Sequence, residues 1–377
     1  MPDIYMRESL ALFTWVLEYF LPFIVLLSVI VFAHEWGHFW FARRNKVKVE
    51  TFAIGFGPEL FGFTDRFGTR WSFNIVPLGG YVKMLGDADA TSATADAGII
   101  SQLTDEERNQ TLHSKTPWQR IQVAFGGPLA NFIFAILAMI ILFAVYGKPI
   151  TPPVVGFVEP TGIGAKHGLM ANDRIVRVND EAIYEFGEVL PFIRSGKHSE
   201  LVVKVERDGK QVDLKIPLTE KVLGIKPSLA MEFKKISLSS VVPESFSTFW
   251  FMSKSIVVGL GELITGQRQG KELGGMLAIG DMASQSVKIG VGAMLWFMII
   301  MSINLGVLNL FPIPVLDGGQ ILMTAIEWVI RRPIPEMVQK IVFGTGFAMV
   351  ISLMIYSTWN DLMRFKIFQM IRGWLPL

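Results

Sequence analysis

The stretch His34-Glu35-Trp36-Gly37-His38 lies inside an apolar run, residues 19–42, that is long enough to cross a lipid bilayer. On a helix, His34 and His38 are about one turn apart and project from the same face, where they can share one metal ion. Glu35 then lies beside the metal and can accept a proton from bound water. An ionisable group in hydrocarbon costs on the order of 3 kcal/mol, so three in one turn require the compensation that metal binding provides.

A purely structural explanation of this stretch is also open. His34 and His38 could be buried histidines that hydrogen-bond to neighbouring polar groups, with Glu35 packing between helices. Three ionisable side chains on successive turns of an apolar helix make this explanation the weaker one.

The composition is typical of a membrane protein that carries a soluble insert. The chain has 377 residues, of which 51% are hydrophobic and 18% charged, and its mean hydropathy is +0.43. The net charge of +2 gives no indication of a nucleic-acid partner. The chain has no cysteine, so a metal site must use His, Asp or Glu. The start of the chain, residues 1–18, lacks the features of a removable signal, so the first apolar helix is expected to remain.

Four stretches are apolar and long enough to span a bilayer, namely residues 19–42, 121–146, 289–311 and 341–356. A fifth run, residues 246–264, contains polar residues and glycines. It could span the membrane or lie flat on its surface, and we expect the flat position.

Short basic segments indicate the orientation of the spans. Residues 43–48 follow the first span and Arg331-Arg332 precede the fourth, which places both on the cytoplasmic side. Both chain termini and the segment between the second and third spans are then outside. Arg364, Lys366 and Arg372 in the tail argue weakly for the opposite orientation.

The segment between the first two spans, residues 49–84, alternates apolar and polar residues between glycines and therefore predicts strands and hairpins. Residues 71–78 are predicted to be an edge strand that dips into the membrane surface, where Trp71, Asn74 and Ile75 could bind an extended substrate. Residues 88–114 are small, polar and charged, which predicts a mobile loop.

The soluble insert, residues 152–218, is predicted to be a compact α+β unit. Strands are expected at residues 154–158, 173–180, 201–206 and 212–216, with a short helix at residues 164–169. Asp208-Gly209 is a strong signal for a two-residue hairpin turn.

A catalytic zinc ion usually has three protein ligands, so His34 and His38 need a partner. Asp317 is the candidate, because it is an isolated acid between a proline-rich turn and Gly318-Gly319 near the cytoplasmic end of the third span. It could instead cap the helix that follows, and different oxygens of Asp317 could do both.

Several motifs together resemble the site-2 proteases, a family of intramembrane zinc metalloproteases, and within it the RseP-type bacterial members that have a single PDZ domain. The resemblance covers nearly the whole chain. It rests on these segments: HEWGH (34–38), GFGPEL (55–60), WSFNIVPLGGYVKMLGD (71–87), GGPLAN (126–131) and NLFPIPVLDGG (309–319). The chain departs from the best-known relative, which has tandem PDZ domains, and has Gly274-Gly275 where many relatives have Gly-Pro.

The resemblance implies roles for individual residues. His34, His38 and Asp317 would bind Zn²⁺ and Glu35 would be the catalytic residue. Asn309, Pro312 and Pro314 would belong to a segment that handles the substrate, and the strand-rich region would be a membrane-associated β-hairpin that pairs with an unwound substrate.

The resemblance also implies a domain organisation. Residues 1–146 would hold the first two transmembrane helices and the β region, and residues 147–225 a periplasmic PDZ-like domain. Residues 226–288 would form an amphipathic segment on the membrane surface, and residues 289–377 the last two spans. The predicted fold is thus a polytopic α-helical membrane protein with four transmembrane helices, a β-hairpin region and an inserted α+β domain.

The expected function is that of a bacterial inner-membrane zinc endopeptidase in regulated intramembrane proteolysis. It would cleave transmembrane segments of single-span proteins after a first cut outside, and the resemblance suggests anti-sigma factors and remnant signal peptides as substrates. The active site would lie near the cytoplasmic side, with lipid but no nucleic acid as a partner. The alternative is a membrane metal carrier or a scaffold that holds partners through the PDZ-like domain.

Two roles for the PDZ-like insert remain open. A groove near residues 162–169 could bind the new C-terminus of a trimmed substrate, or the insert could exclude substrates whose large outer domains are intact. Exclusion is preferred, since no basic residue in that loop is an unambiguous partner for a carboxylate.

Overall fold

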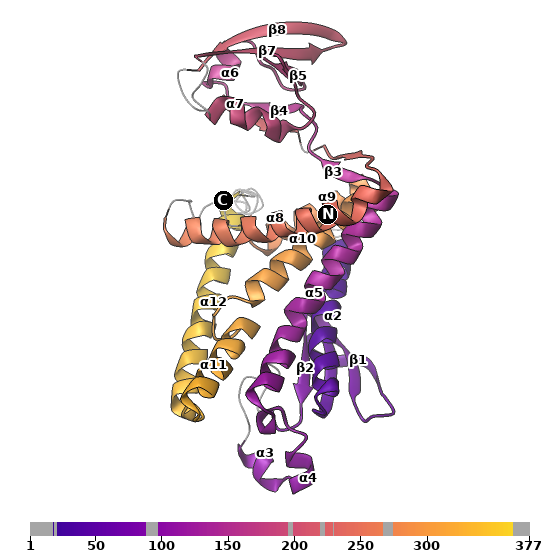
Figure 1. The fold of residues 1–377 in the computed structure, drawn as a ribbon, viewed down its shortest axis with the longest axis vertical. Coiled ribbons are helices and arrows are strands. Elements are labelled where there is room, and N and C mark those ends of the chain that lie inside the picture. The colour runs from indigo at the N-terminus through magenta and orange to yellow at the C-terminus, as the bar shows by residue number, and fades with distance from the viewer. Residues whose placement is uncertain are drawn as a thin grey trace, which may run out of the picture. The chain divides into compact units, whose positions relative to one another are not determined.

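The computed structural model describes residue 18 and residues 21–87, 97–194, 199–218, 223–228, 230–266 and 274–364. The chain divides into two compact units. Unit 1 comprises Met1–Ile141 and Val242–Leu377, and unit 2 comprises Leu142–Val241 (Figure 1). Each unit is described by itself.

Four helices in the described parts of the chain are long and apolar enough to cross a membrane. They are α2 (Leu21–Arg44), α5 (Pro117–Val145), α10 (Val291–Asn309) and α12 (Glu336–Arg364). The number of candidate spans among the described residues is therefore the predicted one, and each helix overlaps the stretch expected from the sequence. α8 (Leu238–Ile264) does not meet the same condition. Its side chains Trp250 and Phe251 are 69% and 70% exposed, as the proposed position on a membrane surface requires, and that position remains a prediction.

The backbones of α2 and α5 approach each other very closely. A Cβ atom added to Gly37 would lie 2.1 Å from the carbonyl oxygen of Gly126, a distance that no packed side chain can occupy. On its N-terminal half, α2 packs Phe23, Leu26 and Ile30 against α9 (Met276–Ile289) and α10. α2 is thus held from several sides within unit 1.

The helix α9 begins with a cap supplied by a distant part of the chain. Asp361 of α12 is 1% exposed and accepts hydrogen bonds from the backbone N–H groups of Gly275 (2.9 Å) and Ala278 (3.0 Å). These N–H groups belong to the first turn of α9 and have no partner within the helix. A proline at position 275 would have no N–H to donate, so this cap requires a residue other than proline there.

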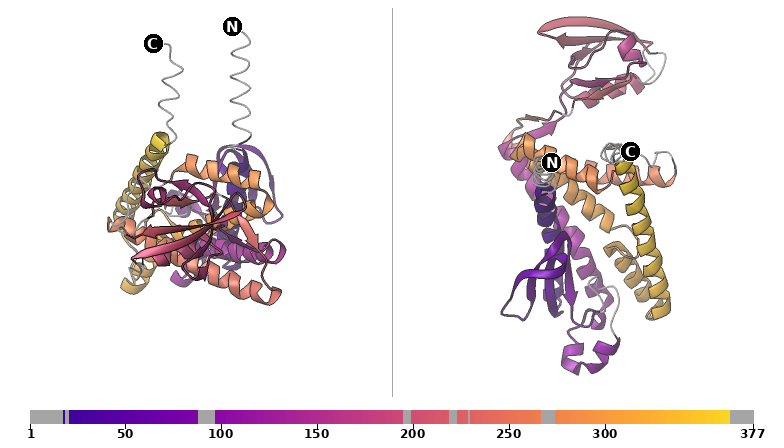
Figure 2. Two further views of the ribbon diagram at one scale, coloured as in Figure 1. Left: turned by 90° about the horizontal axis from the view of Figure 1, so that it is seen from above. Right: turned by 180° about the vertical axis from the view of Figure 1, so that it is seen from behind.

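Between the first two spans, β1 (Val49–Thr64) and β2 (Arg70–Met84) form one sheet (Figures 1 and 2). β1 bends at Gly55 and Gly57, whose φ values of +89° and +83° favour glycine. Because of this bend, the two halves of β1 lie on opposite sides of residues 70–73 of β2.

Residues 51–54 of β1 pair with residues 80–83 of β2 on one side and with residues 70–73 on the other. The far half of β1, residues 59–64, pairs with residues 70–74. Residues 70–73 therefore have a paired segment on both sides. The prediction of an edge strand at residues 71–78 was wrong for this part, since a bend in β1 supplies a second partner that the alternating pattern does not reveal.

Aromatic rings hold this sheet against α2. Phe52 stacks on Trp71 with ring centroids 4.4 Å apart, and Phe39 of α2 lies edge-on to both rings at 5.6 and 5.2 Å. At the turn of the sheet, Asp65 accepts hydrogen bonds from Arg43 (2.6 Å) and from the indole N–H of Trp71 (3.2 Å). Partial burial raises the pKa of Asp65, but the hydrogen bonds from Trp71, from the backbone N–H groups of Thr69 and Phe67 and from Arg43 outweigh it and lower the pKa to about 2.

The region predicted to be a loop after this sheet contains short helices. Residues 88–96 of it lie outside the described residues, but α3 (Ala97–Gln102), α4 (Asp105–Arg108) and η2 (Leu112–Ser114) follow. α4 begins with a capping box in which Thr104 and Glu107 hydrogen-bond reciprocally. The prediction of a loop was wrong from residue 97 on, because the polar composition includes this helix-starting signal.

Unit 2 contains a four-stranded sheet with the strand order β6-β5-β7-β8. Its strands are β5 (Arg174–Val178), β6 (Glu181–Ala182), β7 (Glu200–Arg207) and β8 (Lys210–Pro217). Two further strand pairs join β4 (Val155–Val158) to β9 (Ile225–Pro227) and β3 (Lys148–Ile150) to β10 (Glu232–Lys234). The helices of unit 2 are α6 (Ile163–Lys166), η3 (Phe186–Val189) and α7 (Leu190–Arg194). β7 and β8 are joined by Asp208-Gly209, both at positive φ, as predicted for this two-residue turn.

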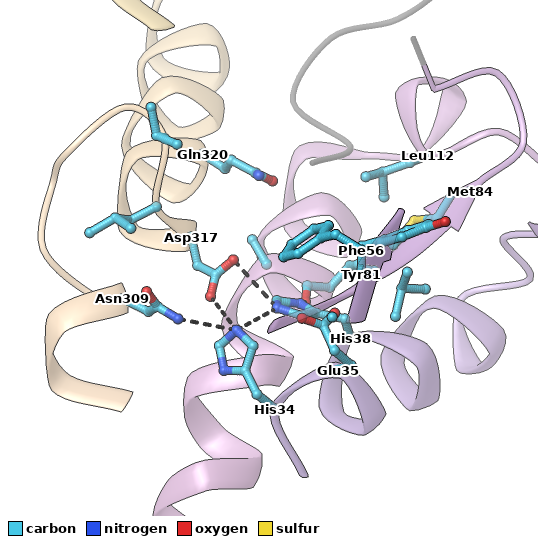
Figure 3. A pocket seen from close by; sticks show the side chains of 16 residues that line it. His34, Glu35, His38, Phe56, Tyr81, Met84, Leu112, Asn309, Asp317 and Gln320 are labelled. Carbon is cyan, nitrogen blue, oxygen red and sulfur yellow. Dashed lines mark hydrogen bonds and ion pairs between the residues drawn. The ribbon is translucent and has the colours of Figure 1, made fainter. Parts of the chain in front are cut away.

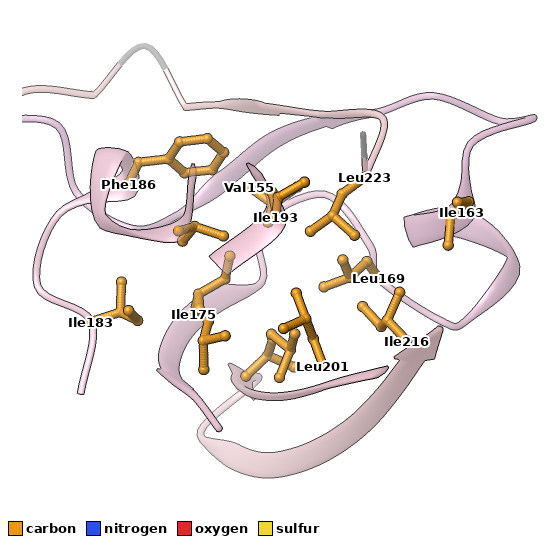
Figure 4. Packing of buried hydrophobic residues seen from close by; sticks show 14 residues of the cluster. Val155, Ile163, Leu169, Ile175, Ile183, Phe186, Ile193, Leu201, Ile216 and Leu223 are labelled. Carbon is orange, nitrogen blue, oxygen red and sulfur yellow. The ribbon is translucent and has the colours of Figure 1, made fainter. Parts of the chain in front are cut away.

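The core of unit 2 is a cluster of aliphatic side chains and one aromatic ring (Figure 4). Val155, Ile175, Leu201 and Ile216 are fully buried at its centre. The α+β character expected for the insert is thus present, and its identity as a PDZ domain remains a prediction.

The contact of Gly37 with Gly126 can be tested by Gly37→Ala. We expect a loss of about 1–3 kcal/mol in the free energy of unfolding, because the new methyl group forces α2 and α5 apart. Thermal unfolding of the detergent-solubilised protein measures the effect. Gly344→Ala on α12 is the matched control, since nothing lies within 4 Å of the added Cβ. Equal unfolding temperatures for the two variants would contradict the close contact.

Candidate metal centre

His34 and His38 lie one helical turn apart on α2, as the sequence predicts. Their Nε2 atoms are 3.2 Å apart and their ring centroids 4.8 Å apart. His34 is 7% exposed. Both rings therefore present a nitrogen to one point on the same face of the helix (Figure 3).

Asp317 brings the third group to this point. Its Oδ2 lies 3.2 Å from Nε2 of His34 and its Oδ1 lies 3.4 Å from Nε2 of His38. One ligand atom from each of the three residues lies within 4.8 Å of the others. Oδ2 of Asp317 is buried and makes no hydrogen bond of acceptable geometry with the described residues. A buried ionised oxygen without a hydrogen bond is unfavourable unless a cation lies beside it.

The glycines after Asp317 explain how the acid reaches the histidines. A Cβ on Gly318 would lie 2.3 Å from the carbonyl oxygen of Leu310, and a Cβ on Gly319 would lie 2.2 Å from that of Ile313. The proline-rich turn can fold onto the start of α11 (Asp317–Ile330) only because these side chains are absent. The N-cap of α11 is Leu316, so the alternative that Asp317 acts as the capping residue was wrong.

A cavity of about 200 Å³ opens at the three side chains (Figure 3). Its lining comes from α2, the sheet, α5, and the segment that leads into α11: His34, Glu35, His38, Phe56, Gly80, Tyr81, Val82, Met84, Leu112, Val123, Ala124, Asn309, Val315, Leu316, Asp317 and Gln320. Glu35 lies next to residues 80–82 of β2, since a Cβ on Gly80 would lie 3.0 Å from Cγ of Glu35. The predicted base thus faces the same small space as the predicted metal ligands.

The predicted substrate residues are only partly brought to this space. The amide nitrogen of Asn309 lies 3.1 Å from Nε2 of His34. Pro312 and Pro314 are absent from the cavity lining, and Pro314 instead packs against α12, where an added Cβ on Gly346 would lie 3.0 Å from its ring.

Trp71, Asn74 and Ile75, the predicted strand residues, are likewise absent from the lining. Trp71 is stacked on Phe52, and the side chain of Asn74 donates to the carbonyl oxygen of Gly55 at 3.1 Å. The part of the sheet that does reach the cavity is residues 80–84, through Gly80, Tyr81, Val82 and Met84.

Sequence reasoning missed two groups on α5 that contact the histidines. The carbonyl oxygen of Val123 lies 2.9 Å from Nδ1 of His38, and the side-chain amide of Asn131 lies 3.1 Å from Nδ1 of His34. A backbone carbonyl leaves no trace in a sequence. Asn131, in contrast, could have been recognised in the sequence, because a lone amide in an otherwise apolar span needs a polar partner.

The donor set fits zinc. Two imidazoles and one carboxylate match the three protein ligands of a catalytic zinc site, in which a fourth position stays open. The carbonyl oxygen of Val123 can only accept a hydrogen bond, so Nδ1 of His38 carries a proton and Nε2 is the nitrogen that would bind a metal ion.

Comparisons with known proteins agree with this chemistry. The chain matches the model of peptidase family M50 over residues 22–353. It is 36% identical to a protein of Rhizobium meliloti that is provisionally named a zinc metalloprotease, and the match covers 92% of this chain and 97% of the relative. It is also similar to Metalloprotease MmpA of Caulobacter vibrioides, at 33% identity over 92% of this chain and 96% of the relative. Zinc metalloprotease RasP of Geobacillus kaustophilus is 29% identical, over 93% of this chain and 99% of the relative.

The apolar helices and these relatives together define a multi-pass membrane metalloprotease that uses zinc. The predicted resemblance to the site-2 protease family is confirmed, and the assignment to members with a single PDZ domain remains a prediction. The chain belongs to peptidase family M50, the site-2 protease family.

The contribution of Asp317 to the zinc site can be tested by metal analysis of Asp317→Ala. We expect zinc to fall from about one ion per chain to well below one, because two imidazoles alone hold the ion weakly. The control is Asp281→Asn, which removes a carboxylate of α9 that accepts a hydrogen bond from Gln285. Full zinc content in Asp317→Ala would contradict its assignment as a ligand.

Proposed function

We propose that this protein is an intramembrane zinc endopeptidase that cleaves the transmembrane segments of single-span membrane proteins. The observation that carries the proposal is the convergence of His34, His38 and Asp317 within 4.8 Å, with Glu35 lining the same cavity and both histidines inside a candidate span. In this proposal His34, His38 and Asp317 bind the zinc ion, and Glu35 is the catalytic residue.

Peptide hydrolysis requires an activated water molecule and a proton donor for the leaving nitrogen. Bound zinc supplies Lewis acidity, which polarises the scissile carbonyl group and brings the pKa of water towards about 7. Glu35 accepts the proton of the attacking water and then donates it to the leaving amine. The amide of Asn309 points at the cluster and is placed to donate a hydrogen bond to the substrate carbonyl oxygen.

A transmembrane helix hides its peptide bonds in backbone hydrogen bonds, so a substrate must unwind before it is cut. We assign the pairing surface for the unwound segment to residues 80–84 rather than to the predicted residues 71–76. Residues 80–83 pair with β1 on one side, and Gly80, Tyr81, Val82 and Met84 also line the cavity. Added backbone pairing there would replace the hydrogen bonds lost on unwinding.

The orientation of the protein follows the basic residues at the ends of the spans. Arg43 and Arg44 end α2, and Arg331-Arg332 follow α11. Cytoplasmic placement of both puts the metal centre near the cytoplasmic side of a bacterial inner membrane and unit 2 in the periplasm. Of the three tail residues that oppose this orientation weakly, Arg364 ends α12, and Lys366 and Arg372 lie outside the described residues.

The proposed substrates are membrane proteins already trimmed outside by another protease, with anti-sigma factors and remnant signal peptides as the expected classes. Unit 2 would serve as the PDZ-like domain that either captures the trimmed end or excludes untrimmed proteins. The family membership and the membrane spans support a membrane-protein substrate in general.

Glu35→Gln tests the catalytic assignment. We expect zinc content to be retained and cleavage of a model transmembrane substrate to fall by about 10²- to 10⁴-fold, since the amide cannot accept the proton. Glu262→Gln on α8 is the control and should cleave normally. A metal carrier or scaffold would tolerate Glu35→Gln, so unimpaired function of that variant would argue for the alternative.

The pairing surface can be tested by photo-crosslinking in the Glu35→Gln background, where bound substrate is not consumed. With p-benzoylphenylalanine in place of Tyr81, which lines the cavity, we expect a crosslink to the substrate. In place of Phe63, on the opposite edge of the sheet and 57% exposed, we expect none. The reverse pattern would place the substrate elsewhere.

A further inference from the structure

One face of α5 supports both histidines. Val123, Gly127 and Asn131 follow one another at intervals of four residues, so they lie along the same side of the helix. Gly127 lets the imidazole rings approach, since a Cβ there would lie 2.3 Å from Nε2 of His38 and 2.7 Å from Cε1 of His34. Val123 and Asn131 contact the Nδ1 atoms of the two rings from either side of Gly127.

The two contacts restrict the tautomers of the two histidines differently. The carbonyl oxygen of Val123 allows a single tautomer of His38, the one with the proton on Nδ1. The amide of Asn131 allows either tautomer of His34, because it can donate through Nδ2 or accept through Oδ1 when it rotates by half a turn.

The environment of Asn131 favours one of these orientations once His34 binds a metal through Nε2. Asn131 is fully buried, and with Nδ2 facing His34 its Oδ1 has no hydrogen-bond partner among the described residues. A metal on Nε2 leaves the proton of His34 on Nδ1, where only an acceptor can meet it. When the amide rotates so that Oδ1 faces Nδ1 of His34, the buried oxygen accepts a hydrogen bond from this proton, and both groups have a partner.

The backbone of Asn131 is itself fixed. The hydroxyl group of Ser302 on α10 donates to the carbonyl oxygen of Asn131 at 3.0 Å, and both residues are fully buried. α5 therefore presents the amide from a position that is tied to a second span.

We propose that Asn131 is a positioning residue whose Oδ1 accepts the Nδ1 proton of His34 and so keeps Nε2 of His34 directed at the zinc ion. The inference rests on the proposed function, in which His34 is a zinc ligand. Asn131 acts through His34 and touches neither the substrate nor the ion.

The test compares Asn131→Leu with Asn131→Asp in the full-length protein in detergent. Zinc affinity is measured by equilibrium competition with a chelator. Asn131→Leu removes the acceptor, and we expect binding about 10- to 100-fold weaker, the usual cost of losing such a partner. The ionised carboxylate of Asn131→Asp can only accept a hydrogen bond, so we expect this variant to bind zinc at least as tightly as the wild type.

A spectroscopic measurement separates positioning from packing. With Co²⁺ in place of zinc, the visible ligand-field bands should change in Asn131→Leu, because the His34 ring can rotate, and should persist in Asn131→Asp. Met139→Ala is the matched control: Met139 is fully buried on α5, two turns beyond Asn131, and its loss should leave both zinc affinity and the bands unchanged.

The possible failures are distinguishable. If His34→Ala retains zinc, the proposed ligand set is wrong and this inference falls with it. If His34→Ala loses zinc but Asn131→Leu binds zinc normally, only the positioning role is overturned. Weakened binding in Asn131→Asp also overturns it, and this result is available even if Asn131→Leu does not fold.

Discussion

The backbones of α2 and α5 touch at Gly37 and Gly126, and this contact determines where the two histidines lie. Gly127 then faces the imidazole rings directly, while the carbonyl oxygen of Val123 and the amide of Asn131 meet their outer nitrogens. Both imidazole rings in this apolar setting thus have a polar partner that comes from the neighbouring helix. Charged and polar side chains are tolerated at such depth when they face one another inside the bundle.

The same principle brings Asp317 to the site from a distant part of the sequence. Gly318 and Gly319 lack the side chains that would collide with the carbonyl groups of the preceding turn, so the start of α11 can fold back onto that turn. Absent Cβ atoms thus matter as much as the ligands themselves, because they let three backbone segments meet around a small volume.

The parts of this arrangement that could be predicted are those with a local signal. The spans follow from length and hydropathy. His34 and His38 are conspicuous because ionisable residues are rare in apolar helices, and Asp317 because it is an isolated acid between a proline-rich turn and two glycines. The edge of the sheet could not be predicted in this way, since the pairing on both sides of residues 70–73 arises from a bend at Gly55 and Gly57. The contact of Val123 is made by a backbone atom and is independent of its side chain. The helix after Thr104, by contrast, had a readable capping signal.

The cap of α9 has a consequence for the order in which the chain is assembled. The N–H groups of Gly275 and Ala278 are satisfied by a carboxylate that lies 86 and 83 residues later in the chain. During synthesis the ribosome delivers that carboxylate only after α10, α11 and nearly all of α12 have been made. Until the last span is inserted, the N–H groups of the first turn of α9 therefore lack this cap and must hydrogen-bond to water or to other groups.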